Sequence, residues 1–134
     1  MRHHLILPIF GFFAWALVTG GAGAAPDLSP QSTSASGVTV KATPKSGSGN
    51  AWEFEIVFDT HSQDLSDDLT QSAVLIVGSG ARYSPLEWRG DPPGGHHRKG
   101  VLRFDAVTPA PDRIELRIQR SGEPSARIYR WQVR

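Results

Sequence analysis

Apolar and polar residues alternate with a period of two along most of the chain from residue 37 onward, which predicts β-strands. The clearest alternation lies in residues 51–60. There Trp52, Phe54, Ile56 and Phe58 are separated by Glu53, Glu55, Val57 and Asp59. Such a strand places one row of side chains in a core and the other row toward solvent.

Six further segments carry strand patterns of this kind: 37–43, 72–77, 82–88, 99–107, 112–120 and 126–134. Residues 72–77 are almost continuously apolar, as in a strand that is buried on both faces. Pro85 lacks a backbone N–H and therefore indicates an edge or bulged strand. The acidic connector 62–70 has no such period, and its aspartates favour turns or a single helical turn.

About seven strands separated by short Gly- and Pro-rich turns predict an all-β fold, an antiparallel immunoglobulin-like β-sandwich. A small closed barrel is the alternative. The chain has no cysteine, so "immunoglobulin-like" describes the architecture only and the domain holds together without disulfides.

Residues 1–24 have the three parts of a secretory signal peptide: a short basic start, the uncharged apolar run 5–18 and a small-residue cleavage site at 22–24. The alternative is an uncleaved anchor, but spanning a bilayer takes roughly 20 apolar residues. We therefore expect a periplasmic or secreted protein with no stable membrane insertion after cleavage. Polar residues 25–36 are expected to be a flexible tether, and 37–134 the β-sandwich domain.

The net charge of the mature chain argues against a nucleic-acid-binding function. The chain has 14 Lys and Arg against 13 Asp and Glu, and cleavage removes Arg2, which leaves 13 − 13 = 0. A protein that binds nucleic acid through its phosphates needs a basic excess. Residues 25–80 contain 2 basic and 7 acidic side chains, whereas residues 81–134 contain 11 and 6. If strands of both halves pair, their charges are expected to neutralise one another across the sheet.

Histidines and carboxylates gather in three stretches. Asp59 and His61 are two residues apart at the end of a strand, so they share a face. Three aspartates follow within residues 64–68, and two glycines precede His96 and His97. Imidazole and carboxylate groups are ligands of zinc and copper. The sequence thus predicts a copper or zinc site formed by His61, His96, His97 and Asp59. Alternatively, these histidines are simply solvated loop residues.

No pattern predicts catalysis, and we expect no enzyme activity. Ser62 follows His61, but adjacency in sequence does not make a nucleophile–base pair, and residues 78–80 resemble a turn rather than a phosphate cradle. The competing function is that of a structural or interaction domain, which holds a protein partner at an exposed sheet edge or aromatic loop.

Five short motifs occur in this chain: Asp-Thr-His-Ser-x-x-Leu (59–65), Asp-Leu (68–69), Pro-Leu-x-Trp-x-Gly (85–90), Pro-Gly-Gly-His-His-Arg-x-Gly-x-Leu-x-Phe (93–104) and Arg-x-Tyr-Arg-Trp (127–131). In these motifs the chain resembles a group of small uncharacterised exported prokaryotic proteins. The resemblance implies that residues 59–69 and 94–97 form one feature of the fold, and it implies no activity.

Overall fold

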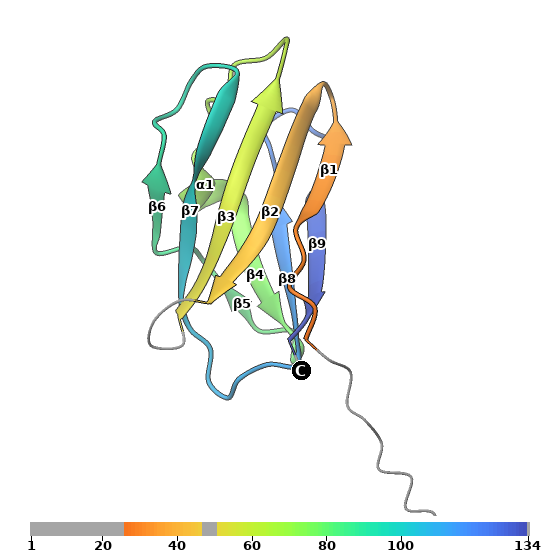
Figure 1. The fold of residues 1–134 in the computed structure, drawn as a ribbon, viewed down its shortest axis with the longest axis vertical. Helices are drawn as coiled ribbons and strands as arrows, with labels where there is room; N and C mark the ends of the chain where they lie inside the picture. The colour runs from red at the N-terminus through yellow and green to blue at the C-terminus, as the bar shows by residue number, and fades with distance from the viewer. Residues whose placement is uncertain (1–25, 47–50, 134) are drawn as a thin grey trace, which may run out of the picture.

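Two antiparallel sheets pack face to face in the computed structural model, which describes residues 26–46 and 51–133 (Figure 1). The described elements are β1 (Gln31–Ala35), β2 (Val38–Ser46), β3 (Ala51–Thr60), α1 (Leu69–Ser72), β4 (Ala73–Val77), β5 (Arg82–Tyr83), β6 (Glu87–Gly90), β7 (His97–Ala106), β8 (Arg113–Ile118) and β9 (Arg127–Gln132).

The strand order is β1-β2-β3-β7-β6 in one sheet and β5-β4-β8-β9 in the other. Every strand pair is antiparallel. The predicted all-β antiparallel sandwich is therefore confirmed.

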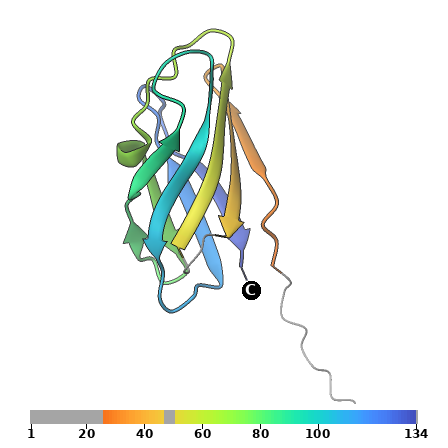
Figure 2. The same cartoon turned by 60° about the vertical axis from the view of Figure 1, so that its left-hand side comes forward.

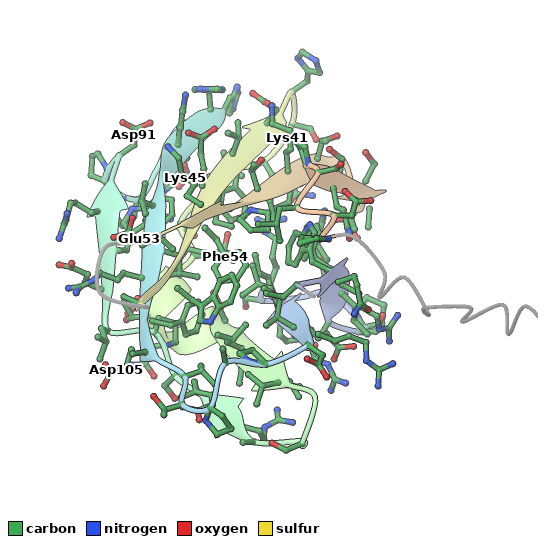
Figure 3. The ribbon with its side chains drawn as sticks, turned by 60° about the horizontal axis from the view of Figure 1, so that its bottom comes forward. Lys41, Lys45, Glu53, Phe54, Asp91 and Asp105 are labelled. Carbon is green, nitrogen blue, oxygen red and sulfur yellow. The ribbon has the colours of Figure 1, made fainter. Side chains whose placement is uncertain are left out.

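The core lies between the sheets and is built from the apolar rows that the alternation predicted. Phe54 of β3 is fully buried and lies between the two sheets (Figure 3). Its ring meets Phe104 of β7 edge-on at a centroid distance of 5.7 Å and Trp131 of β9 at 5.5 Å. Aromatic packing of this kind joins the two sheets.

The predicted strand 82–88 is two short strands that belong to different sheets. Arg82 and Tyr83 pair with β4 in the four-stranded sheet, whereas β6 pairs with β7 in the five-stranded sheet. Pro85 stands between them and has no N–H for a ladder, so the strand breaks there. The next residue, Leu86, donates its N–H to Arg103 at 2.8 Å, which starts the new pairing.

The flexible tether predicted for residues 25–36 is wrong for residues 31–35, because they form β1 and pair with β2. Just before β1, Asp27 pairs with Gln132 of β9, and the Trp131 indole donates to the Ser29 carbonyl at 2.8 Å. This segment thus passes from one sheet to the other and closes the side of the sandwich between β9 and β1 (Figure 2). Its Ser-rich composition concealed the strand, since an edge strand needs few apolar residues.

The signal peptide expected at residues 1–24 lies outside the described residues, as does residue 25. In the part of the chain that is described, no helix has the length and apolar character needed to cross a bilayer.

Candidate functional site

The predicted polar stretches meet at one end of the sandwich, which we call the loop end. It consists of residues 61–68, 91–96 and 119–126 together with the strand residues next to them, at the top of Figure 1. Leu65 and the glycines before the histidines exchange backbone hydrogen bonds: Leu65 donates to the Gly95 carbonyl at 3.1 Å, and Gly94 donates to Leu65 at 2.9 Å. Gly94 and Gly95 have φ of 119° and 74°, which suits glycine. The acidic connector and the His-His segment therefore pack together.

Asp59 and His97 form a direct contact at the loop end. They face each other across β3 and β7, and His97 Nδ1 lies 2.5 Å from Asp59 Oδ1. Both side chains are mostly exposed, at 61% for His97 and 59% for Asp59. Because water surrounds this pair, its net contribution to stability is small, on the order of 0–1 kcal/mol.

The other two predicted ligands, His61 and His96, are exposed and do not join that pair. Across the described ranges, no three histidine, aspartate or glutamate side chains are grouped closely enough to hold a metal ion. Of the four predicted ligands, the structure thus brings only Asp59 and His97 into contact.

The carboxylates of the acidic connector have structural partners. Asp64 accepts a hydrogen bond from the Gly95 N–H at 2.9 Å. Asp68 caps α1 by accepting from the N–H and hydroxyl of Thr70, and these hydrogen bonds lower the pKa of Asp68. Asp67 forms an ion pair with Arg120 at 3.0 Å. These aspartates hold the loop end together and are not a free ligand set.

Arg98, which directly follows the two histidines, anchors the loop end. It is 2% exposed, and its guanidinium lies 5.2 Å from the centre of the Trp88 ring. It donates to the backbone carbonyls of Asp91, Leu65 and Asp67. Burial lowers the pKa of Arg98, an effect that nearby carboxylates oppose. The sequence motif did not indicate this role of Arg98, because its two histidines were the predicted functional residues and the arginine after them was not.

Glu123 links two more buried arginines at this end. Its carboxylate lies 2.6 Å from Arg127 and 3.3 Å from Arg120. The hydrogen bond from Arg127 lowers the pKa of Glu123 and outweighs the effect of burial, which raises it. Arg127 also donates to the carbonyls of Thr33, Ala35 and Val38, so it ties β9 to β1 and β2.

A second region is the outer face of the four-stranded sheet, which we call the arginine face. Strand register and alternate burial place nine side chains on it: Val74, Ile76, Arg82, Arg113, Glu115, Arg117, Ile128, Arg130 and Gln132. Among the described residues, four arginines therefore stand against a single glutamate on this face. At the β9 border Asp27 pairs with Gln132, and its carboxylate accepts from Ser29.

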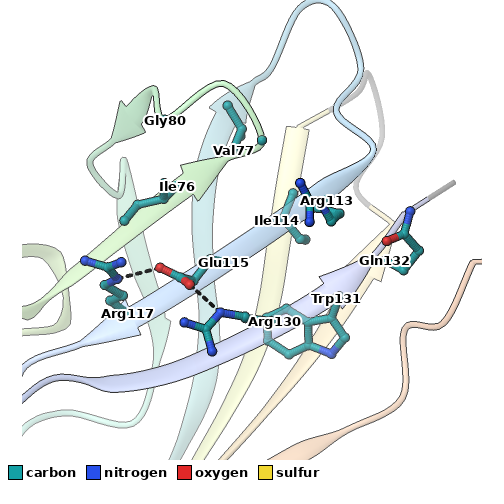
Figure 4. A pocket seen from close by; sticks show the side chains of 11 residues that line it. Ile76, Val77, Gly80, Arg113, Ile114, Glu115, Arg117, Arg130, Trp131 and Gln132 are labelled. Carbon is teal, nitrogen blue, oxygen red and sulfur yellow. Dashed lines mark hydrogen bonds and ion pairs between the residues drawn. The ribbon is translucent and has the colours of Figure 1, made fainter.

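Glu115 occupies the middle of the arginine face and contacts two of its arginines (Figure 4). Its carboxylate accepts from Arg117 Nε at 2.5 Å and from Arg130 Nε at 2.6 Å. Burial raises the pKa of Glu115, but these hydrogen bonds outweigh burial and leave the pKa below its usual value. Within the described residues, the side chains of Arg82 and Arg113 have no ion-pair partner.

A hollow of about 450 Å³ lies on this face, beside the turn that follows β4. Gly78 and Gly80 border the hollow and contribute no side chain to it. Ile76 supplies aliphatic surface, and Arg113 and Arg130 supply charge. The hollow is open to solvent, and its lining combines apolar side chains, arginines and Glu115.

The outer face of the five-stranded sheet differs from the arginine face. Glu55 of β3 lies 3.7 Å from Lys45 and 3.9 Å from Lys99, on the two neighbouring strands. Glu53 is likewise 3.8 Å from Arg103. The expected neutralisation of the two halves therefore holds on this face. It fails on the arginine face, because β4 comes from the acidic half of the chain but has no charged residue.

Comparison of this chain with protein-family models, with curated proteins and with solved structures finds no match. The resemblance to small exported prokaryotic proteins therefore stays a prediction.

Proposed function

We propose that this protein is a non-catalytic binding module that acts in the periplasm or outside the cell and holds an anionic partner on its arginine face. The observation that carries the proposal is the imbalance of four arginines against one glutamate among the described residues of that face. The export signal expected at residues 1–24 supports the location.

Arginine suits such a role because its planar guanidinium matches carboxylate and phosphate groups with two parallel hydrogen bonds. Arg82 and Arg113 have no ion-pair partner within the described residues, so their donors are available to a ligand. Binding would then not require breaking an existing contact, which lowers its cost. The aliphatic surface of Ile76 adds apolar area that a partner could cover.

The experiment compares two variants that lose the same charge on opposite faces. Arg82→Gln/Arg113→Gln alters the arginine face, and Lys41→Gln/Lys45→Gln alters the outer face of the five-stranded sheet. Binding to immobilised poly-L-glutamate is measured at low salt. We expect a loss of about tenfold in affinity, which corresponds to ~1.4 kcal/mol, for the arginine variant only. Equal losses in both variants would mean that net charge alone drives binding.

A second candidate function is a copper or zinc site, which the contact between Asp59 and His97 supports. These side chains already provide one nitrogen and one oxygen donor, and His61 and His96 stand on the adjoining loops. The test is thermal unfolding with and without zinc or copper(II), since an ion that binds only the folded protein raises its stability. A shift at micromolar metal that His61→Ala/His97→Ala abolishes supports this candidate. No shift with either ion contradicts it.

A further inference from the structure

The chemistry of the arginine face also limits the kind of partner. Resting on the function proposed above, we infer that the partner is an acidic polypeptide in which apolar side chains lie among the carboxylates. An acidic carbohydrate polymer or a nucleic acid would provide anions without aliphatic side chains.

Glu115 shows which anionic group the face accommodates. Its carboxylate is held by Arg117 Nε at 2.5 Å and by Arg130 Nε at 2.6 Å, so a side-chain carboxylate fits between arginines of neighbouring strands. Arg82 and Arg113 offer the same donors, and no carboxylate among residues 26–46 and 51–133 accepts from them. A carboxylate of the partner would give these two arginines the kind of contact that Arg117 and Arg130 already have.

Aliphatic side chains are interleaved with the arginines. Ile76 lies directly between Arg82 and Glu115 across the sheet, and Val74 lies beside Arg117. Ile128, opposite Arg117 on β9, is 39% exposed, although it is a large apolar residue. Because neighbouring strands are about 4.8 Å apart, charged and apolar positions alternate at distances that side chains of one polypeptide can match.

The distribution of lysine and arginine also favours an acidic polypeptide over a general polyanion. Lys41, Lys45 and Lys99 are the only lysines of the chain, and all three lie on the outer face of the five-stranded sheet. Lysine is a compact point charge that attracts any anion, whereas arginine favours planar groups and tolerates apolar surroundings. A general polyanion would be attracted by either residue type, but only arginine occurs among Ile76 and its apolar neighbours.

A second copy of this chain is a poor occupant of the arginine face. Two such faces would bring eight arginines together against two glutamates, twice the four and one of a single face, and like charges in an interface are unfavourable. Charge complementarity therefore requires a partner of different composition.

The test uses fluorescence anisotropy with three labelled probes: poly-L-glutamate, a copolymer of glutamate and leucine, and heparin. They are compared at equal anion concentration and salt. We expect the copolymer to bind about tenfold more tightly than poly-L-glutamate, because it adds apolar contact to the same carboxylates. Ile76→Thr keeps a β-branched residue in the strand, and it should remove this preference, so that the variant binds the copolymer and poly-L-glutamate with affinities within about twofold of each other.

The outcomes separate this inference from the function on which it rests. If all probes bind, but heparin binds more tightly than the copolymer or Ile76→Thr has no effect, the acidic-polypeptide inference is overturned and the anion-binding function stands. If no probe binds, both fail. Melting temperatures of the variants show whether any loss comes from unfolding.

Discussion

Arginines serve two different purposes in this protein, at the loop end and on the arginine face. At the loop end, Arg98, Arg120 and Arg127 are at most 5% exposed, and carbonyl and carboxylate oxygens accept their hydrogen bonds. On the arginine face, Arg82 and Arg113 are exposed and lack an ion-pair partner within the described residues. The comparison teaches that burial and available acceptors, rather than residue type, decide whether an arginine stabilises the fold or is free to bind.

The energetic reason is the cost of removing charge from water. A buried guanidinium is tolerated only when nearly all its donors are satisfied, and breaking such an arrangement leaves uncompensated charge and unpaired acceptors. An exposed guanidinium keeps its hydration and contributes little to stability. Substitutions in the two regions should therefore differ widely in their effect on unfolding.

The largest effect is expected for Arg127→Ala. This change leaves the buried Glu123 carboxylate without its closest cation and removes the guanidinium donor from the carbonyls of Ala35 and Val38. Loss of one partner of a buried ion pair costs about 3–5 kcal/mol. Urea unfolding of the variant and the parent measures the difference.

Arg127→Lys is the matched control for that change. It keeps the positive charge but cannot reproduce the guanidinium fork. The free energy of unfolding of Arg127→Lys should therefore lie between that of the parent and that of Arg127→Ala. If both variants unfold at the same urea concentration as the parent, the loop end does not depend on this arginine.

A smaller effect is expected from acid. Arg127 lowers the pKa of the Glu123 carboxyl in the folded protein. The pKa of a glutamate in an unfolded chain is about 4.3. The stabilisation from Glu123 is therefore complete above that pH and is lost as the pH falls through the lower pKa of the folded protein. The free energy of unfolding should therefore decrease in acid, and less steeply in Glu123→Gln. Parallel pH profiles for the two proteins would contradict this role.

A substitution with an intermediate effect on stability tests the contact between the acidic connector and the His-His segment. Asp64→Ala removes the carboxylate that accepts from the Gly95 N–H. Since this hydrogen bond is exposed, the expected cost is about 1 kcal/mol, as for an ordinary hydrogen bond and less than for a buried charged acceptor. Asp64→Asn keeps an acceptor oxygen and should restore about half of the loss. Chemical denaturation of all three proteins provides the comparison.

These two regions also show which features of the structure could be predicted from the sequence and which could not. The period of two in residues 51–60 was enough to identify β3 and its buried row. It could not reveal that Arg98 is buried, because Trp88 and the carbonyls around it come from other segments. The arginine face depends on register: only the pairing of β4 with β8 shows that an uncharged strand lies beside Arg113 and Arg117.

The smallest expected change in stability comes from Arg82→Gln/Arg113→Gln. Both side chains are exposed, and neither has an ion-pair partner within the described ranges, so removal of their charge should alter the free energy of unfolding by no more than about 0.5 kcal/mol. For a domain of this size, that corresponds to a shift in melting temperature of less than about 4 °C. A larger loss, measured by calorimetry, would mean that these arginines support the fold as those of the loop end do. A loss of binding with an unchanged melting temperature would instead show that the two regions have separate functions.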